Sequence, residues 1–123
     1  MASHAIHAVH HTIMDYENNC GLVPSQDYEL VVVLNSKGGI FALDPTISED
    51  TEHKLAYKNM AIADQIKDFM TMHDVKFKLC NITLTHFLEG NENQIIDGIE
   101  LVPSGVTTTM DLQDEGYTYY AAL

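Results

Sequence analysis

Two strand-like runs on either side of a long helical stretch constrain the fold more than any other feature of the sequence. Residues 29–35 read ELVVVLN, a continuous β-branched run of the kind found in strands buried on both faces of a sheet. Residues 75–80 read VKFKLC, in which side chains of opposite character alternate. Strands joined through a helical crossover pair in parallel, so these runs predict a parallel sheet.

The other segments continue the alternation of helices and strands. A long helix is predicted from about Glu52 to Met72, because apolar residues recur there at helical spacing, at Leu55, Ile62, Ala63, Ile66, Phe69 and Met70. Further helices are predicted over residues 4–18, 82–88 and 105–114, and further strands over residues 98–102 and 117–121. The sequence therefore predicts an α/β fold with helices on both faces of the sheet.

Length and charge limit the classes of protein to which the chain can belong. Its 123 residues are 46% hydrophobic and contain no long linker, so we expect a single domain over residues 1–123. Eighteen acidic residues against six basic ones give a net charge of −12, which repels phosphate backbones and anionic lipid. No segment has the uninterrupted apolar length of a membrane span. We expect neither a nucleic-acid nor a membrane partner.

The two cysteines, Cys20 and Cys80, are the residues with the clearest chemical potential. They lie far apart in a chain without a cysteine-rich framework, so we expect two separate thiols in a reducing compartment. Cys80 ends the 75–80 strand, where parallel α/β proteins gather reactive groups. A helix beginning directly afterwards would lower the pKa of the Cys80 thiol through its free N–H groups and its dipole. The sulfur would then be nucleophilic at neutral pH.

A second interpretation treats Cys80 as a small apolar residue that completes a core strand. The alternation places Cys80 on the same face of its strand as Lys76 and Lys78. The two lysines on this face predict that Cys80 lies at the rim of the sheet, with positive charge near the thiol. The pattern leaves both the reactive and the packed cysteine open.

Four histidines near the N-terminus form a candidate metal cluster. Helical spacing puts His4, His7 and His11 on the face opposite the apolar stripe of their helix, with His10 beside them. An exposed helix alone supplies neither the remaining ligand nor the supporting hydrogen bonds of a metal site. We therefore expect no physiological metal and no cofactor.

Two further side chains have a simpler interpretation than a catalytic one. His86 follows Cys80 by six positions and would have to reach back to act as its general base. Ser104 lies between Pro103 and Gly105, where a hydroxyl that caps the next helix is expected. No partner residues of a nucleophilic serine are indicated.

Four motif-bearing stretches follow one another along the chain, at residues 31–43 (VVVLNSKGGIFAL), 73–84 (HDVKFKLCNITL), 95–106 (IIDGIELVPSGV) and 112–121 (LQDEGYTYYA). The second has an alternating strand that ends on cysteine, the third a V-P-S-G-V turn, and the fourth a G-Y-x-Y ending. In this order and spacing the stretches resemble the DsrE/DsrF-like (TusD-like) family of small sulfur-relay proteins. The resemblance covers roughly residues 4–121.

The resemblance implies a three-layer αβα fold with a mainly parallel sheet of about four to five strands. It also implies a homo-oligomer such as a trimer or hexamer. In the characterised branches, the cysteine matching Cys80 accepts sulfane sulfur as a persulfide and passes it to a partner, so Cys80 is the only catalytic residue that carries over. The chain would be a sulfurtransferase with donor and acceptor proteins. The alternative is a non-catalytic oligomeric binding or assembly module with a structural cysteine.

The sequence departs from the family pattern at two places. Many members read C-G-N-T/S-L where residues 80–84 read CNITL, so we expect a differently shaped loop after the thiol. The family also opens with a strand, whereas here the helix over residues 4–18 comes first, so that strand is expected to be missing or to precede this chain. The expected compartment is cytoplasmic, or periplasmic if an upstream signal was removed.

Overall fold

Three parallel strands lie at the centre of the computed structural model, which describes residues 3–35, 42, 60–86 and 95–119. The strands are β1 (Val31–Leu34), β2 (Lys76–Cys80) and β3 (Glu100–Val102), in the order β1-β2-β3. The predicted α/β fold with a parallel sheet is confirmed, with three strands among the described residues. The register pairs Leu34 with Leu79 on one side of β2 and Cys80 with Val102 on the other.

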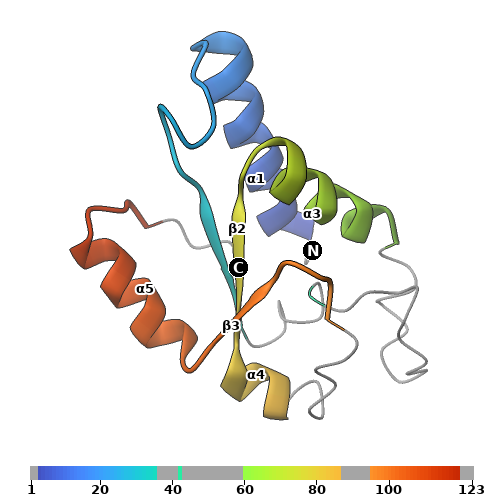
Figure 1. The fold of residues 1–123 in the computed structure, drawn as a ribbon, viewed down its shortest axis with the longest axis vertical. Coiled ribbons are helices and arrows are strands. Elements are labelled where there is room, and N and C mark those ends of the chain that lie inside the picture. Colours follow the sequence, from blue (N-terminus) through green and yellow to red (C-terminus); the bar gives the residue numbers. More distant parts are fainter. Residues whose placement is uncertain (1–2, 36–41, 43–59, 87–94, 120–123) are drawn as a thin grey trace.

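Helices cover both faces of this sheet (Figure 1). Helix α1 (Ser3–Met14) and helix α3 (Met60–Met72) lie on one side, and helix α5 (Gly105–Asp114) lies on the other. Helix α4 (Asn81–His86) extends beyond the end of β2. The arrangement is the predicted three-layer αβα fold. No helix in the described ranges is both long enough and apolar enough to cross a membrane.

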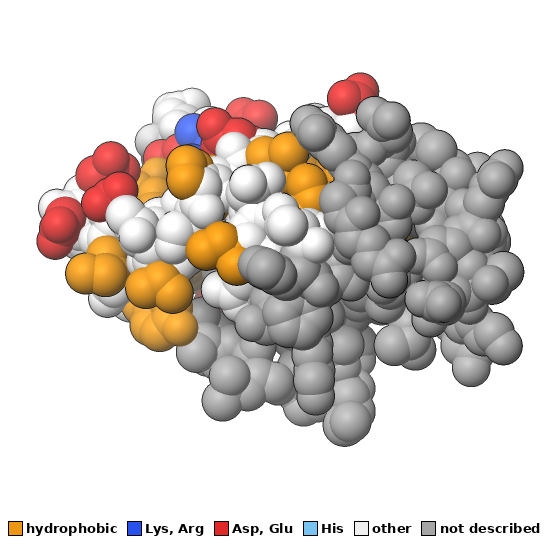
Figure 2. Space-filling view, turned by 90° about the horizontal axis from the view of Figure 1, so that it is seen from below, with side chains coloured by type: hydrophobic (Ala, Val, Ile, Leu, Met, Phe, Trp, Pro, Cys, Tyr) orange, Lys and Arg blue, Asp and Glu red, His pale blue; other side chains and the backbone are white. Residues whose placement is uncertain are grey.

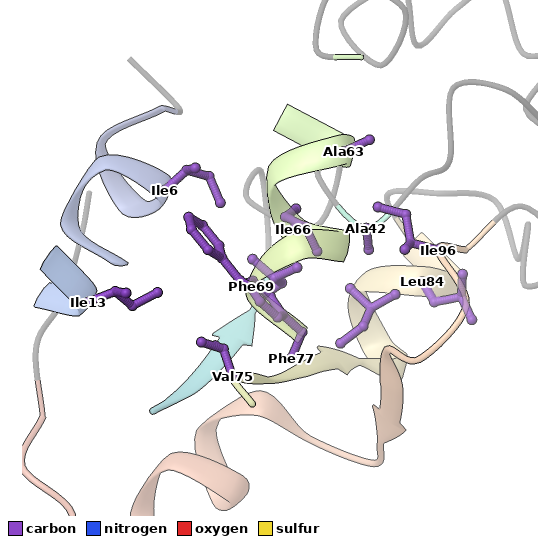
Figure 3. Packing of buried hydrophobic residues seen from close by; sticks show 12 residues of the cluster. Ile6, Ile13, Ala42, Ala63, Ile66, Phe69, Val75, Phe77, Leu84 and Ile96 are labelled. Carbon is purple, nitrogen blue, oxygen red and sulfur yellow. The ribbon is translucent and has the colours of Figure 1, made fainter. Parts of the chain in front are cut away.

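The hydrophobic core lies between β2 and the helical layer of α1 and α3 (Figure 3). Val75, Phe77 and Leu79 share one face of their segment and are all buried, as their alternation predicts. The stripes of α1 and α3 meet them with side chains that are also buried, namely Ile6, Ile13, Ala63, Ile66 and Phe69. The apolar stripes predicted for these helices are therefore confirmed where their side chains are described; Leu55 and Ile62 lie outside that part.

The strand predictions need two corrections. Val31, Val32 and Val33 are only half-buried, because β1 lies at an edge of the described sheet and not in its interior as the run of valines predicted. The prediction of a closing strand over residues 117–121 is wrong for the residues that the structure describes, since residues 117–119 follow the end of α5 as irregular chain. Residues 120–121 lie outside the described residues.

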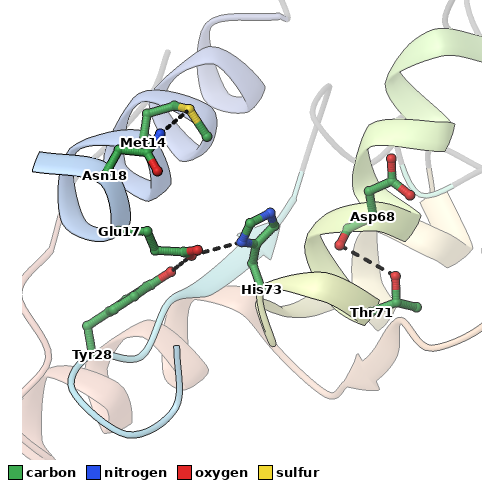
Figure 4. Close-up of polar contacts among 7 residues, drawn as sticks. All are labelled: Met14, Glu17, Asn18, Tyr28, Asp68, Thr71 and His73. Atoms are coloured by element: carbon green, nitrogen blue, oxygen red, sulfur yellow. Dashed lines mark hydrogen bonds and ion pairs between the residues drawn. The ribbon is translucent and has the colours of Figure 1, made fainter. Parts of the chain in front are cut away.

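A shared carboxylate connects the N-terminal helical layer to the sheet (Figure 4). After α1 the chain continues as a π-helix, η1 (Asp15–Asn19), which carries Glu17. One oxygen of Glu17, Oε2, lies 2.8 Å from Nδ1 of His73, just beyond the end of α3, and also accepts a hydrogen bond from the Tyr28 hydroxyl. Because three segments meet at one partly buried oxygen, Glu17 fixes how η1 sits against the sheet.

We predict that Glu17→Ala lowers the free energy of unfolding by about 1–3 kcal/mol, because it leaves two partly buried polar groups without their acceptor. Asp15→Ala is the matched control, since Asp15 is an exposed carboxylate of the same π-helix and should cost less than about 0.5 kcal/mol. Urea denaturation of both variants measures the difference. Equal losses would show that the shared carboxylate has no special role.

Candidate functional site

Cys80 lies at the junction of β2 and α4 with no residue between the two elements. Parallel strands end at the same edge of a sheet, so the residues that follow the neighbouring strands collect around it. Asn35 follows β1 directly, and the Pro103–Ser104 turn leads from β3 to the start of α5. Figure 2 views the molecule from the end that α4 occupies. The predicted strand-end position of the thiol is confirmed.

Hydrogen-bond donors converge on the sulfur of Cys80. Burial by itself raises the pKa of the Cys80 thiol and is the largest single effect. The backbone N–H groups of Thr83, Gly105 and Ile82 and the hydroxyl of Thr83 act in the opposite direction, and together they bring the pKa below its ordinary value. Each of these groups favours the thiolate over the thiol.

The donors come from two helices that begin beside the thiol. Cys80 immediately precedes α4, so the N–H groups of the second and third residues of that helix lie near its sulfur and lower the pKa of the thiol. Gly105 is the first residue of α5, whose N-terminus is capped by Ser104, with the serine hydroxyl accepting from the Thr107 N–H at 3.4 Å. The capping role predicted for Ser104 is thus confirmed.

Gly105 permits this close approach because it has no side chain. A Cβ atom added at Gly105 would lie 3.3 Å from the Cβ of Cys80 and 3.0 Å from the side-chain nitrogen of Asn35. Both distances are tighter than ordinary packing, so a larger residue at this position would require its neighbours to shift by a few tenths of an ångström. The glycine therefore brings the start of α5 against both β2 and the end of β1.

The prediction that Cys80 lies at the rim of the sheet is wrong. Cys80 is 6% exposed, because α5 packs over the face of β2 on which the lysines and the cysteine lie. Lys78 pairs with Glu100 at 3.1 Å, and Lys76 pairs with Glu29 at 2.5 Å. The lysine charges are thus compensated by carboxylates, and the groups that lower the pKa of the thiol are N–H and O–H donors.

The missing family glycine does not produce a loop at Asn81. The non-glycine residues with positive φ in the described ranges are Ser25 and Asp74, and Asn81 is the first residue of α4. A side chain is compatible with that helical conformation, so glycine is not needed there. The differently shaped loop that we expected is instead a direct transition from strand to helix.

Sequence reasoning missed Thr83 as a functional residue. Its side chain is buried, and its hydroxyl is one of the groups that lower the pKa of the Cys80 thiol. The position of Thr83 in the sequence could have indicated this role. A hydroxyl three residues after the residue that precedes a helix lies over the first turn of that helix.

The remaining candidates lie away from this thiol or outside the described side chains. Cys20 is an exposed free thiol beyond the end of η1, which agrees with the prediction of two separate cysteines. The His7 and His11 rings stack at 6.1 Å on α1, but the described residues contain no group of three or more potential metal ligands. The side chains of His4 and His86 lie outside the described part of the structure.

A pocket of about 450 Å³ lies at the opposite end of the sheet from Cys80. Its walls come from the last turns of α3 and from the beginnings of β2 and β3, including Met70, Phe77 and Gly98. The pocket is therefore separate from the carboxyl edge that holds the thiol.

The fold and the site define a class of protein, a three-layer α/β domain with a thiol that caps a helix at the carboxyl end of a central parallel strand. The model of the DsrE/DsrF-like family matches residues 8–120, nearly the whole chain. This chain belongs to the DsrE/DsrF-like family. No curated protein matches the sequence.

We predict that Thr83→Val raises the pKa of the Cys80 thiol, because it removes the hydroxyl donor and keeps the shape of the side chain. The measurement is the rate of Cys80 alkylation by iodoacetamide against pH, in a Cys20→Ser background so that one thiol is followed. The midpoint should move to higher pH, since the removed hydroxyl is one of the groups that lower the pKa of the thiol.

Thr85→Val is the matched control on the same helix. The Thr85 hydroxyl donates to the Asn81 carbonyl at 3.0 Å and is exposed. Its loss should leave the alkylation midpoint unchanged. A shift as large in Thr85→Val as in Thr83→Val would contradict a direct hydrogen bond to the sulfur.

Proposed function

We propose that this protein is a sulfur carrier that accepts sulfane sulfur on Cys80 as a persulfide and passes it to a partner protein. The observation that carries the proposal is the position of Cys80 at the carboxyl end of the central strand, where α4 begins directly after it and the start of α5 lies against it at Gly105. Membership in the DsrE/DsrF-like family supports a sulfur-relay role in general. The assignment to Cys80 rests on its environment in this chain.

The chemistry consists of two exchange reactions with no net oxidation. In the first, the Cys80 thiolate attacks the outer sulfur of a donor persulfide, R–S–SH, the donor S–S bond breaks, and R–S⁻ leaves. Cys80 then carries –S–SH. In the second, an acceptor thiolate attacks that outer sulfur and the Cys80 thiolate leaves.

The same donors assist both reactions. They raise the thiolate fraction of Cys80 for the first attack, and they stabilise Cys80 as the departing thiolate in the second. A lower pKa weakens the attacking sulfur somewhat but improves it as a leaving group. An environment that lowers the pKa moderately therefore suits a residue that has to receive a sulfur atom and release it again.

The direct test measures the intact mass of the protein after incubation with a low-molecular-weight persulfide. We expect the wild type and Cys20→Ser to gain one sulfur atom, and Cys80→Ser to gain none at the matching position. Peptide mapping locates the adduct. A wild-type protein without a sulfur adduct on Cys80 would refute the proposal.

A second candidate function is a non-catalytic oligomeric binding or assembly module in which Cys80 is structural. The observation that favours it is the burial of the thiol at 6% exposure. A sulfur held only for packing would meet no reagent in the folded protein. The homo-oligomer predicted from the resemblance is common to both candidates.

Alkylation of the folded protein separates the two candidates. We predict that a sulfur carrier reacts with iodoacetamide at neutral pH faster than Cys80 in the Thr83→Val variant, and without prior unfolding. A structural thiol would react only at the rate of global unfolding, which urea would accelerate. Exposed Cys20 provides the internal standard for reagent activity.

A further inference from the structure

Three exposed apolar side chains lie on the two helices that begin beside the buried thiol. Val106 is 68% exposed, Met110 59% and Ile82 53%. Two of them adjoin the site, since Ile82 is the second residue after Cys80 and Val106 follows Gly105, which lies against Cys80. Figure 2 shows hydrophobic side chains on the described part of the face at this end of the molecule.

The outer side of α5 changes from apolar to acidic along its length. Val106 and Met110 are one turn apart and share a face, and Asp114 lies one further turn along, with Asp111 beside it. Both aspartates are exposed, and α5 contains no basic residue. This surface is therefore apolar near the start of α5, beside the thiol, and negatively charged near the end of the helix.

We propose that this surface, formed by Ile82, Val106, Met110, Asp111 and Asp114 and called here the α4–α5 surface, docks a basic and apolar polypeptide segment that carries the partner thiol. The proposal rests on the proposed function, because it names the chemistry of the partner that exchanges sulfur with Cys80. Apolar side chains of the partner cover Val106 and Met110, and its lysine or arginine side chains face the two aspartates.

Charge complementarity selects this occupant over a second copy of the chain. The protein has a net charge of −12, so a copy would bring more negative charge toward Asp111 and Asp114. A basic segment would be attracted instead. Cys80 is also buried, so a partner has to hold its own sulfur in position next to the Cys80 sulfur while the exchange takes place.

The test uses short synthetic peptides with a central cysteine. One is flanked by leucine and lysine, a second by leucine and glutamate, and a third by serine and lysine. Serine versions with a fluorescent label report binding by anisotropy, and persulfidated versions report sulfur transfer to Cys80 by mass. We expect the leucine and lysine peptide to bind and react fastest, and added salt to reduce its advantage.

Variants of the surface should weaken this preference, each by about threefold. Met110→Gln removes an apolar contact, and Asp111→Asn with Asp114→Asn removes the charges. The matched controls lie on α3, where Met72→Gln changes a methionine that is 68% exposed and Asp64→Asn with Asp68→Asn neutralises two exposed aspartates. The controls should leave binding and transfer unchanged.

The outcomes separate this inference from the proposed function. If a small persulfide loads Cys80 but the three peptides bind alike, or the α5 variants behave as the α3 controls do, the docking inference is wrong and the sulfur carrier stands. If no persulfide loads Cys80, the sulfur carrier is wrong, and the labelled serine peptides still decide docking. Variants that change only the oligomeric state of the protein would assign the surface to a second copy and overturn the inference.

Discussion

The parallel pairing of β2 with both of its neighbours is the constraint on which the rest of the structure depends. It aligns the ends of three strands, so that Asn35, Cys80 and the turn before Gly105 arrive at one edge although they are distant in sequence. The same pairing orients Phe77 and Leu79 toward α1 and α3 and turns Cys80 toward α5. One register therefore sets both the core and the site.

Two opposing effects determine the chemical state of the thiol. Removal from water favours the neutral form, and hydrogen bonds to the sulfur favour the anion. In this protein the second effect prevails for Cys80, because α4 and α5 both begin at the sulfur and Thr83 adds a hydroxyl. Burial and a lowered pKa therefore occur together at Cys80, since the wall around the thiol is made partly of N–H and O–H groups.

Periodicity predicted the elements well because it depends on which side chains face a core. The buried face of β2, the stripe of α3 and the helix from Gly105 to Asp114 were all accessible in this way. Periodicity did not show what covers the other face of β2, so Lys76 and Lys78 suggested an exposed rim. Their pairing with Glu29 and Glu100 and the contact of Gly105 with Cys80 arise from tertiary packing. The role of Thr83 likewise required the position of the sulfur.

The direct transition from β2 to α4 has a consequence for how this site tolerates change. Most of the groups that polarise the Cys80 sulfur are main-chain amides, which every residue except proline provides. Substitutions at Ile82 can therefore change the exposed side chain at this surface and leave the main-chain amides around the sulfur in place. Under the proposed function, recognition of the partner depends on the side chains of these residues and the reactivity of the sulfur depends on their main chain, so one can diverge without the other.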